Sequence, residues 1–180
     1  MPAPVSIYGA TKLAQEHLLS AWAGSHDTAL SVLRLQNVYG PRQSLTNPYT
    51  GIVSFFSQLA REGRSIPLYE DGMITRDFVY IDDVVSALVA AVDHAPSGED
   101  GGFRLADVGS GRATTIRELA EVVAAFHAAP EPHVTGQFRD GDVRHASCAP
   151  SVLGDLDWTP VWSLEDGVSA LQRWIAEQGS

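Results

Sequence analysis

The sequence predicts an α/β fold with parallel strands, and two observations lead to this class. Segments with strand-like patterns alternate with amphipathic helical segments along the chain, as in folds where helices cover a sheet. The segment from Thr28 to Leu35 is apolar with little alternation, which indicates a strand buried on both faces. With 180 residues, 44% of them hydrophobic, the chain can form one domain with a sizeable core.

Five helices are expected from apolar periodicity and from the residues at which they begin. Ser6 is expected to cap the first helix, Thr114 the fourth, and Ser163, three residues before Asp166, the fifth, because their side-chain oxygens can accept N–H groups of the first turn. Asp82 or Asp83 is expected to start the third, with acid at its positive end. The expected ranges are 6–22, 51–61, 84–92, 114–126 and a last helix from residue 163.

Strand-like segments are fewer than a complete parallel sheet needs. A parallel strand buried on both faces requires neighbouring strands, yet only two or three segments suit that role. We therefore expect the rest of the sheet to be missing or to be supplied by another chain. The glycine-rich stretch 95–102 is the expected loop or hinge. The expected strands are 28–35, 65–69, 75–80, 103–108 and 134–138.

Charge and composition exclude several partners. The formal net charge of −10 disfavours nucleic acid and anionic membranes, which attract clustered lysine and arginine. No apolar run approaches the ~20 residues of a membrane span. The single cysteine, Cys148, cannot form an intrachain disulfide, which suits a cytoplasmic location. Six scattered histidines show no metal-ligand spacing, so we expect no metal site.

Tyr8 and Lys12 form a candidate acid/base pair, although Tyr-x-x-x-Lys alone is a common spacing. Four residues apart at a helix start, the two side chains lie on one helical face. Tyrosine has a pKa of about 10 and is a poor base at neutral pH, but a neighbouring ammonium group favours the phenolate. Such a tyrosine can remove a proton from a hydroxyl group while hydride leaves the same carbon. A surface helix contact is the alternative interpretation.

The surrounding motifs make the pair specific. In order along the chain stand Tyr8-Gly-Ala-Thr-Lys12, Leu33-Arg-Leu-Gln-Asn-Val-Tyr-Gly-Pro41, Asn47-Pro-Tyr-Thr-Gly51 and Arg76-Asp-Phe-Val-Tyr-Ile-Asp-Asp-Val84. This series resembles the extended short-chain dehydrogenase/reductase family, specifically its NAD-dependent nucleotide-sugar epimerases and dehydratases. The stretch from Gln36 to Gly51 is most similar to the dTDP-L-rhamnose 4-epimerase members.

The resemblance implies a fold and a set of roles. The fold would be a partial Rossmann-type sheet, with late strands only, interleaved with a small substrate-binding subdomain as one unit over residues 1–180. Tyr8 would be the acid/base and Lys12 its activator and a ribose contact, while Gln36 would lie beside the nicotinamide of NAD. The nucleotide-sugar substrate would be bound by Asn37, Tyr49, Thr50, Arg76, Arg139, Asp142 and Arg144, where arginine suits phosphate oxygens.

Structural alternatives stand beside several of these roles. Asn37 follows a strand and suits a turn, and Arg76 next to Asp77 suits a surface ion pair. Arg139 and Arg144 lie among acidic residues, so a solvated charge cluster also explains them. The segment Gly109-Ser-Gly-Arg-Ala-Thr114 lacks the third glycine of a dinucleotide fingerprint and is interpreted as a structural turn.

The same resemblance predicts what the chain does by itself. Family members begin with a strand, a glycine-rich turn and a helix that receives the pyrophosphate, and this amino-terminal NAD-binding half is absent from the sequence. We therefore expect weak NAD binding, no turnover by the chain alone, and a sticky surface that favours a homodimer or oligomer. Two alternatives remain: a 4,6-dehydratase, or a non-catalytic nucleotide-sugar module that pairs with a separate Rossmann chain.

Overall fold

The computed structural model describes residues 2–45, 51–97, 102–138, 144–148, 156 and 158–178. Helices and small, mostly parallel sheets alternate along the chain, which confirms the α/β class predicted from the sequence. Among these residues, no helix is both long and apolar enough to cross a membrane. The elements are α1 (Ile7–Ser25), β1 (Leu30–Leu35), β2 (Asn37–Tyr39), α2 (Ile52–Arg61), β3 (Pro67–Leu68), β4 (Thr75–Arg76), β5 (Phe78–Tyr80), α3 (Ile81–Asp93), β6 (Phe103–Val108), β7 (Thr114–Thr115), α4 (Ile116–His127), β8 (His133–Val134), β9 (His145–Ala146) and α5 (Leu164–Gln178).

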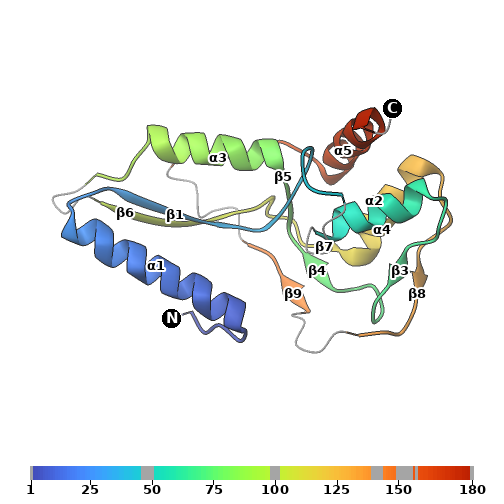
Figure 1. The fold of residues 1–180 in the computed structure, drawn as a ribbon, viewed down its shortest axis with the longest axis horizontal. Coiled ribbons are helices and arrows are strands. Elements are labelled where there is room, and N and C mark those ends of the chain that lie inside the picture. The colour runs from blue at the N-terminus through green and yellow to red at the C-terminus, as the bar shows by residue number, and fades with distance from the viewer. Residues whose placement is uncertain are drawn as a thin grey trace.

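A parallel pair of strands, β1 and β6, forms one end of the molecule. The pair runs in register from Leu30 opposite Phe103 to Leu35 opposite Val108. Helices α1 and α3 lie on opposite sides of this pair (Figure 1). Among the described residues, β1 pairs with β6 alone, so its second edge is open. Buried Val84, Ala87 and Ala91 of α3 pack against the sheet and bury Ala106 and Val108 of β6.

The opposite end of the molecule is a helical core built by α2, α4 and α5, with β3 and β8 beside it (Figure 1). Its apolar stripes recur at helical spacing and meet in one cluster. One polar contact crosses this core: the side-chain amide of Gln172 donates to Ser57 at 2.7 Å, and its oxygen lies 3.0 Å from His127. The fully buried members include Phe56, Leu119, Val123, Val168, Leu171 and Ile175.

Two short sheets join these ends. Strand β2 follows β1 directly and pairs in parallel with β5, while β4 lies between β7 and β9. The chain therefore passes from one small sheet to the other between β4 and β5, at Asp77. Residues far apart in sequence meet at this junction, because β9 brings residues 145–146 beside residues 75–76.

Several sequence expectations agree with the structure in detail. Ser6 caps α1 by accepting the Gly9 N–H at 3.1 Å, and Ser163 accepts the Asp166 N–H at 3.0 Å at the start of α5. The strand expected over residues 103–108 has those bounds. Asp82 and Asp83 both lie in the first turn of α3, but the helix begins at Ile81, before either acid, and extends to Asp93.

Other expectations were wrong in their details. The cap of α4 is Thr115, which accepts the Glu118 N–H at 3.0 Å, whereas Thr114 is buried in β7. The strand expected over residues 75–80 is interrupted at Asp77, where the chain changes sheets. The strand expected over residues 134–138 is confined to residues 133–134. Strands β2 and β9 were not anticipated. Each has only two or three residues and is extended because it pairs with a neighbouring strand.

Candidate active site

The first group of candidate residues lies in the opening turns of α1. The Lys12 ammonium is 5.6 Å from the centroid of the Tyr8 ring, so both side chains share one face of the helix. Both are exposed, and Tyr8 retains 72% of its accessible surface. The amino-terminal end of α1, which carries them, is directed toward β9 in Figure 1. The Tyr8 and Lys12 side chains are thus accessible to a ligand at the amino-terminal end of α1, the end nearer β9.

Gln36 and Asn37 lie where β1 ends and β2 begins. The Gln36 N–H donates to the Val108 carbonyl at 2.9 Å, which extends the β1–β6 pairing by one bond. Asn37 is exposed and donates twice to the Asp77 carbonyl, from its backbone N–H at 2.9 Å and from Nδ2 at 3.3 Å. Asn37 is therefore part of a strand and not only a turn residue, and it stands at the carboxyl end of β1, where α/β folds place ligands.

Arg76 belongs to the short strand β4 and is partly buried. One of its terminal guanidinium nitrogens donates to the Thr75 carbonyl at 2.8 Å. Its backbone pairs with Thr114 on one side and with Ala146 on the other. Because Asp77, the next residue, bonds Asn37 through its carbonyl, two of the predicted substrate contacts, Arg76 and Asn37, are brought together by the fold.

Sequence reasoning missed the role of Asp77. This residue is fully buried, so the surface ion pair considered for it is wrong. Its carboxylate accepts the Ser110 N–H and hydroxyl, both at 2.7 Å, and the Gly111 N–H at 2.9 Å. Two sequence features accompany this arrangement: a lone acid before one apolar strand, and a glycine turn after a second strand. Both are too common for the sequence alone to predict that they meet.

The contacts of Asp77 also settle the nature of the Gly109–Gly111 turn. Phosphate-binding turns present free backbone N–H groups to the ligand. Here the N–H groups of Ser110 and Gly111 are already bonded to an internal carboxylate. A phosphate at this position would meet that buried negative charge. The turn is therefore structural, as the missing third glycine indicated.

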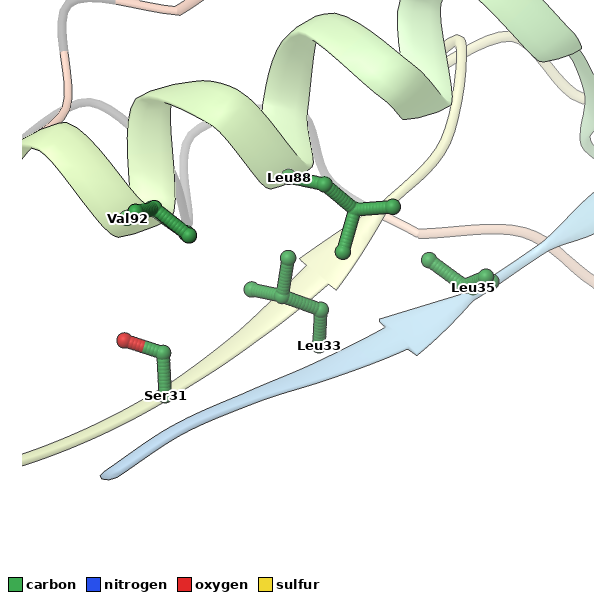
Figure 2. A pocket seen from close by; sticks show the side chains of 6 residues that line it. Ser31, Leu33, Leu35, Leu88 and Val92 are labelled. Carbon is green, nitrogen blue, oxygen red and sulfur yellow. The ribbon is translucent and has the colours of Figure 1, made fainter.

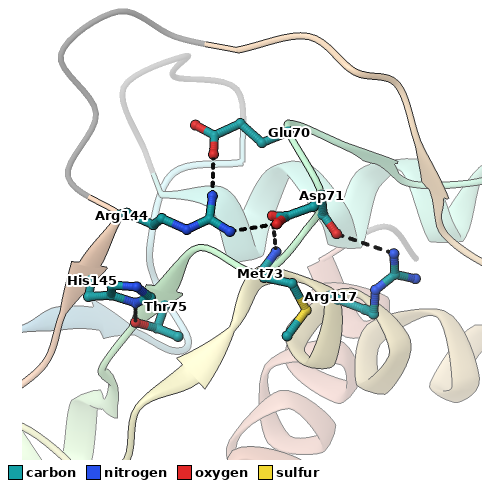
Figure 3. A network of polar contacts seen from close by, with 7 residues as sticks. All are labelled: Glu70, Asp71, Met73, Thr75, Arg117, Arg144 and His145. Atoms are coloured by element: carbon teal, nitrogen blue, oxygen red, sulfur yellow. Dashed lines mark hydrogen bonds and ion pairs between the residues drawn. The ribbon is translucent and has the colours of Figure 1, made fainter.

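Arg144 takes part in an ion-pair network at the surface (Figure 3). Its guanidinium bonds Glu70 at 2.7 Å and Asp71 at 2.5 Å, and its carbonyl accepts the Thr75 N–H at 2.9 Å. The pKa of Asp71 is lowered, first by the Met73 N–H and then by Arg144. Both terminal nitrogens of Arg144 thus contact carboxylates, which favours a structural role over phosphate binding.

The remaining candidates are not placed. Tyr49, Thr50, Arg139 and Asp142 lie outside the described residues. Two surface hollows are lined by α3 together with β1 or with Leu156, and neither includes a predicted site residue. Among the described residues, no cluster of three His, Cys, Asp or Glu side chains is arranged to hold a metal ion. The described candidates therefore form two groups, Tyr8 with Lys12 on α1, and Gln36, Asn37 and Arg76 around Asp77. Neither of the two hollows includes a residue of either group.

Comparison with solved structures places this arrangement in a class. The whole chain superposes on 56% of the UDP-glucose 4-epimerase of Thermotoga maritima, solved with UDP-glucose, with a TM-score of 0.87 and 31% identity. It also matches 55% of the Thermus thermophilus UDP-glucose 4-epimerase, solved with NAD, over 97% of this chain, with a TM-score of 0.81 and 30% identity. The fold is therefore that of Rossmann-type nucleotide-sugar enzymes.

Sequence comparison gives the family. The sequence pattern of the NAD dependent epimerase/dehydratase family matches residues 1–105. The dTDP-L-rhamnose 4-epimerase of Burkholderia thailandensis is 60% identical over 98% of this chain, and the UDP-glucose 4-epimerase of Mycolicibacterium smegmatis is 36% identical over 92%. The chain belongs to the NAD dependent epimerase/dehydratase family. It spans about half the length of these relatives, 48% and 51% respectively.

The described residues fit one part of an NAD site. Tyr8 and Lys12, exposed on one helical face, offer a hydroxyl and an ammonium group to a ribose, and Gln36 lies at the adjoining strand end. The Gly109–Gly111 turn does not suit the pyrophosphate, because its N–H groups at Ser110 and Gly111 bond Asp77. Among the described residues, the hydroxyl of Tyr8 and the ammonium group of Lys12 therefore suit a ribose.

Proposed function

We propose that this chain is the substrate-binding, Tyr8- and Lys12-bearing half of an NAD-dependent nucleotide-sugar 4-epimerase, inactive by itself. The observation that carries the proposal is the Lys12 ammonium beside the Tyr8 ring at 5.6 Å, on an exposed helical face. Residues 1–180 would form one partial unit, in which the late strands of the Rossmann sheet alternate with the substrate-binding segments. The glycine-rich amino-terminal half that family members have would complete the NAD site.

The chemistry assigned to this half is proton transfer. The Tyr8 phenolate takes the proton of the sugar 4-hydroxyl as hydride leaves C4, and a 4-keto sugar forms. Lys12, on the same helical face, is assigned to orient Tyr8 and to contact the cofactor ribose. Return of hydride to the other face of C4, with the proton returned by Tyr8, gives the epimer. Bound NAD supplies the hydride acceptor and donor for this reaction.

Substrate binding is assigned to the group around Asn37 and Arg76. The Asn37 amide is held at the carboxyl end of β1 by the Asp77 carbonyl, and Arg76 carries a guanidinium group suited to diphosphate oxygens. Tyr49, Thr50, Arg139 and Asp142 are proposed as further contacts from the family resemblance. Arg144 is the weakest of the proposed contacts, because Glu70 and Asp71 already bond it.

The identity to one relative supports a specific substrate. The Burkholderia thailandensis protein, 60% identical, is a dTDP-L-rhamnose 4-epimerase, so we propose a dTDP-linked 6-deoxy sugar. A dTDP-glucose 4,6-dehydratase of Neisseria gonorrhoeae is 28% identical, which leaves the dehydratase alternative with weaker support. A dehydratase also needs further acid/base groups for the elimination step.

A second candidate function is a nucleotide-sugar module that pairs with a separate Rossmann chain. The open edge of β1 favours it, as does the hollow of about 240 Å³ between β1 and α3. Leu33, Leu35, Leu88 and Val92 point into this hollow (Figure 2), where the Ser31 hydroxyl is buried and has no hydrogen-bond partner in the described structure. A partner that adds a parallel strand beside β1 and an apolar helix would cover this face.

Calorimetry with the purified chain tests the proposal. We expect dTDP to bind more tightly than UDP, NAD+ to bind weakly, and Arg76→Met to weaken dTDP binding. Arg64→Met is the control, because Arg64 pairs with Glu62 on the surface of a different segment. Absence of dTDP and UDP binding would contradict the substrate assignment, and tight NAD+ binding by the chain alone would contradict the division between the two halves.

A further inference from the structure

Asp77 is a junction of four segments that are distant in sequence. The residue stands between β4 and β5 and is fully buried. Its Oδ1 accepts the N–H and hydroxyl of Ser110, each at 2.7 Å, and its Oδ2 accepts the Gly111 N–H at 2.9 Å and the Cys148 thiol at 3.4 Å. The carboxylate thus binds the turn after β6 and the segment after β9 to the start of β5.

The backbone of Asp77 holds a fourth segment. Its carbonyl accepts both the N–H and the side-chain amide of Asn37, at 2.9 and 3.3 Å. The adjacent residue, Arg76, is the last residue of β4. Two of the residues assigned to substrate binding are therefore placed by Asp77, one through a hydrogen bond and one through the peptide link.

Close packing keeps this junction in one arrangement. A Cβ atom added at Gly109 would lie 2.5 Å from Asp77 Oδ2, 2.6 Å from Cys148 Sγ and 2.8 Å from Gln36 Cγ. Such distances leave no room for a side chain at residue 109, so the turn can approach Asp77 only because residue 109 is glycine. Gln36, assigned to the nicotinamide side, packs against the same turn.

The four donors suit a carboxylate and not its amide. Each carboxylate oxygen accepts two hydrogen bonds here, whereas an amide presents one accepting oxygen and one donating NH₂ group. Substitution with asparagine would direct that NH₂ toward donors and leave buried N–H groups without acceptors. The change keeps the size of the side chain, so it tests the hydrogen bonds more than the packing.

We infer that Asp77 is a positioning residue of the nucleotide-sugar site, which fixes Asn37 and Arg76 relative to the Gln36 strand end by binding the turn at Ser110 and Gly111. This inference rests on the proposed function, because it concerns the same site. Asp77 is buried and acts on the ligand only through its neighbours. Its effect should therefore appear in the affinity for the nucleotide and not only in stability.

The test compares Asp77→Asn with Asp83→Asn by calorimetry with dTDP. Asp83 is an equally buried carboxylate that bonds backbone N–H groups away from the site. At a temperature where both variants are folded by circular dichroism, we expect Asp77→Asn to weaken dTDP binding about tenfold. Asp83→Asn should leave the affinity within about twofold of the parent chain.

A second measurement uses Cys148, the one cysteine of the chain. Removing the neighbouring anion favours the thiolate, so Asp77→Asn should speed the reaction of Cys148 with iodoacetamide at pH 8, and Asp83→Asn should not. This readout shows that the Asp77 contact has been changed in a folded protein. Faster alkylation together with unchanged dTDP affinity would overturn the inference.

The outcomes separate this inference from the proposed function. If the parent chain binds neither dTDP nor UDP, the proposed function fails and the inference fails with it. If the parent binds and Asp77→Asn binds equally well, only the inference fails. Should Asp77→Asn not fold, Ser110→Ala and Cys148→Ala each remove one donor, and a parental affinity in both variants would overturn the inference.

Discussion

The Arg34 guanidinium in β1 donates two hydrogen bonds to the Glu16 carboxylate in α1, at 2.8 and 2.7 Å. Glu16 is four residues beyond Lys12 and eight beyond Tyr8, so the three side chains lie along one side of the helix. The pair therefore fixes the rotation of α1 about its axis. The side of α1 that carries Tyr8 and Lys12 is therefore turned toward β1. Gln36 and Asn37 follow the carboxyl end of that strand.

Replacing Glu16 with glutamine should loosen this attachment. The pair is bidentate but partly exposed, with 36% of the Arg34 side chain and 17% of the Glu16 side chain accessible. We therefore expect the free energy of unfolding, measured in urea, to fall by only about 0.5–1 kcal/mol. Glu62→Gln, which affects a more exposed ion pair with Arg64, should have no measurable effect.

The pH dependence of the same variant follows from the pKa of Glu16. The hydrogen bond from Arg34 lowers this pKa below its ordinary value of 4.5. A lowered pKa in the folded state contributes stability above pH 4.5 that is lost as the pH falls through the folded-state value. The difference between the parent and Glu16→Gln should thus be present at pH 7 and shrink on acidification. A difference that is constant down to pH 3 would contradict this account.

Asp83 supports a second prediction. Its buried carboxylate accepts the N–H groups of Val161 and Trp162, at 3.0 and 3.1 Å, and so attaches the segment before α5 to the start of α3. Asp83→Asn leaves one of these groups without a full acceptor and should reduce the free energy of unfolding by about 1–3 kcal/mol. Asp82→Asn is the matched control, because Asp82 lies in the same helical turn but is exposed.

The value of sequence reasoning differed between these features. The helix caps Ser6 and Ser163 and the strand 103–108 were predictable, because side-chain type and apolar pattern act locally there. The pair Tyr8 and Lys12 was also predictable, since a spacing of four on a helix determines that the two side chains share a face. The family motifs gave the order of the remaining elements.

The junction at Asp77 was not predictable from the sequence. Its four donors come from residues 110, 111 and 148, and contacts between segments so far apart depend on the packing of the whole chain. Strand β9 escaped detection for the same reason: His145 and Ala146 form a strand only because β4 offers its edge. The dipeptide Arg-Asp is the same in the sequence whether the acid is buried, as at Asp77, or forms an ion pair at the surface.

Tyr8→Phe tests the assigned proton transfer. The variant removes the hydroxyl and keeps the ring beside Lys12, so dTDP affinity of the chain should remain within about twofold of the parent. In a chimaera with the amino-terminal half of the Burkholderia thailandensis relative, turnover of a dTDP-linked sugar should fall by about 10²–10⁴-fold. Tyr69→Phe, an exposed tyrosine outside the proposed site, serves as the control. Retention of full turnover by Tyr8→Phe would exclude the assigned role.

The Cys148 thiol should react slowly in the folded chain. Burial, followed by the charge of Asp77, raises its pKa from 9.0 to about 12, so little thiolate is present at pH 8. We expect alkylation by iodoacetamide to be at least about tenfold slower than in the urea-unfolded chain, and to speed up as the pH rises toward 12. A raised folded-state pKa gives stability that is full below pH 9 and is lost at higher pH. Equal rates in folded and unfolded chains would refute the assignment.

The apolar face beside β1 should make the isolated chain self-associate. Leu88 and Val92 of α3 are 46% and 75% exposed and border the hollow at the open edge of β1 (Figure 2), and exposed apolar faces and open strand edges both promote association. Leu88→Lys should lower the weight-average mass measured by sedimentation at equal concentration. Val134→Lys is the control, because Val134 is also 46% exposed but lies in β8. An effect of Val134→Lys equal to that of Leu88→Lys would show that association depends on net charge and not on this face.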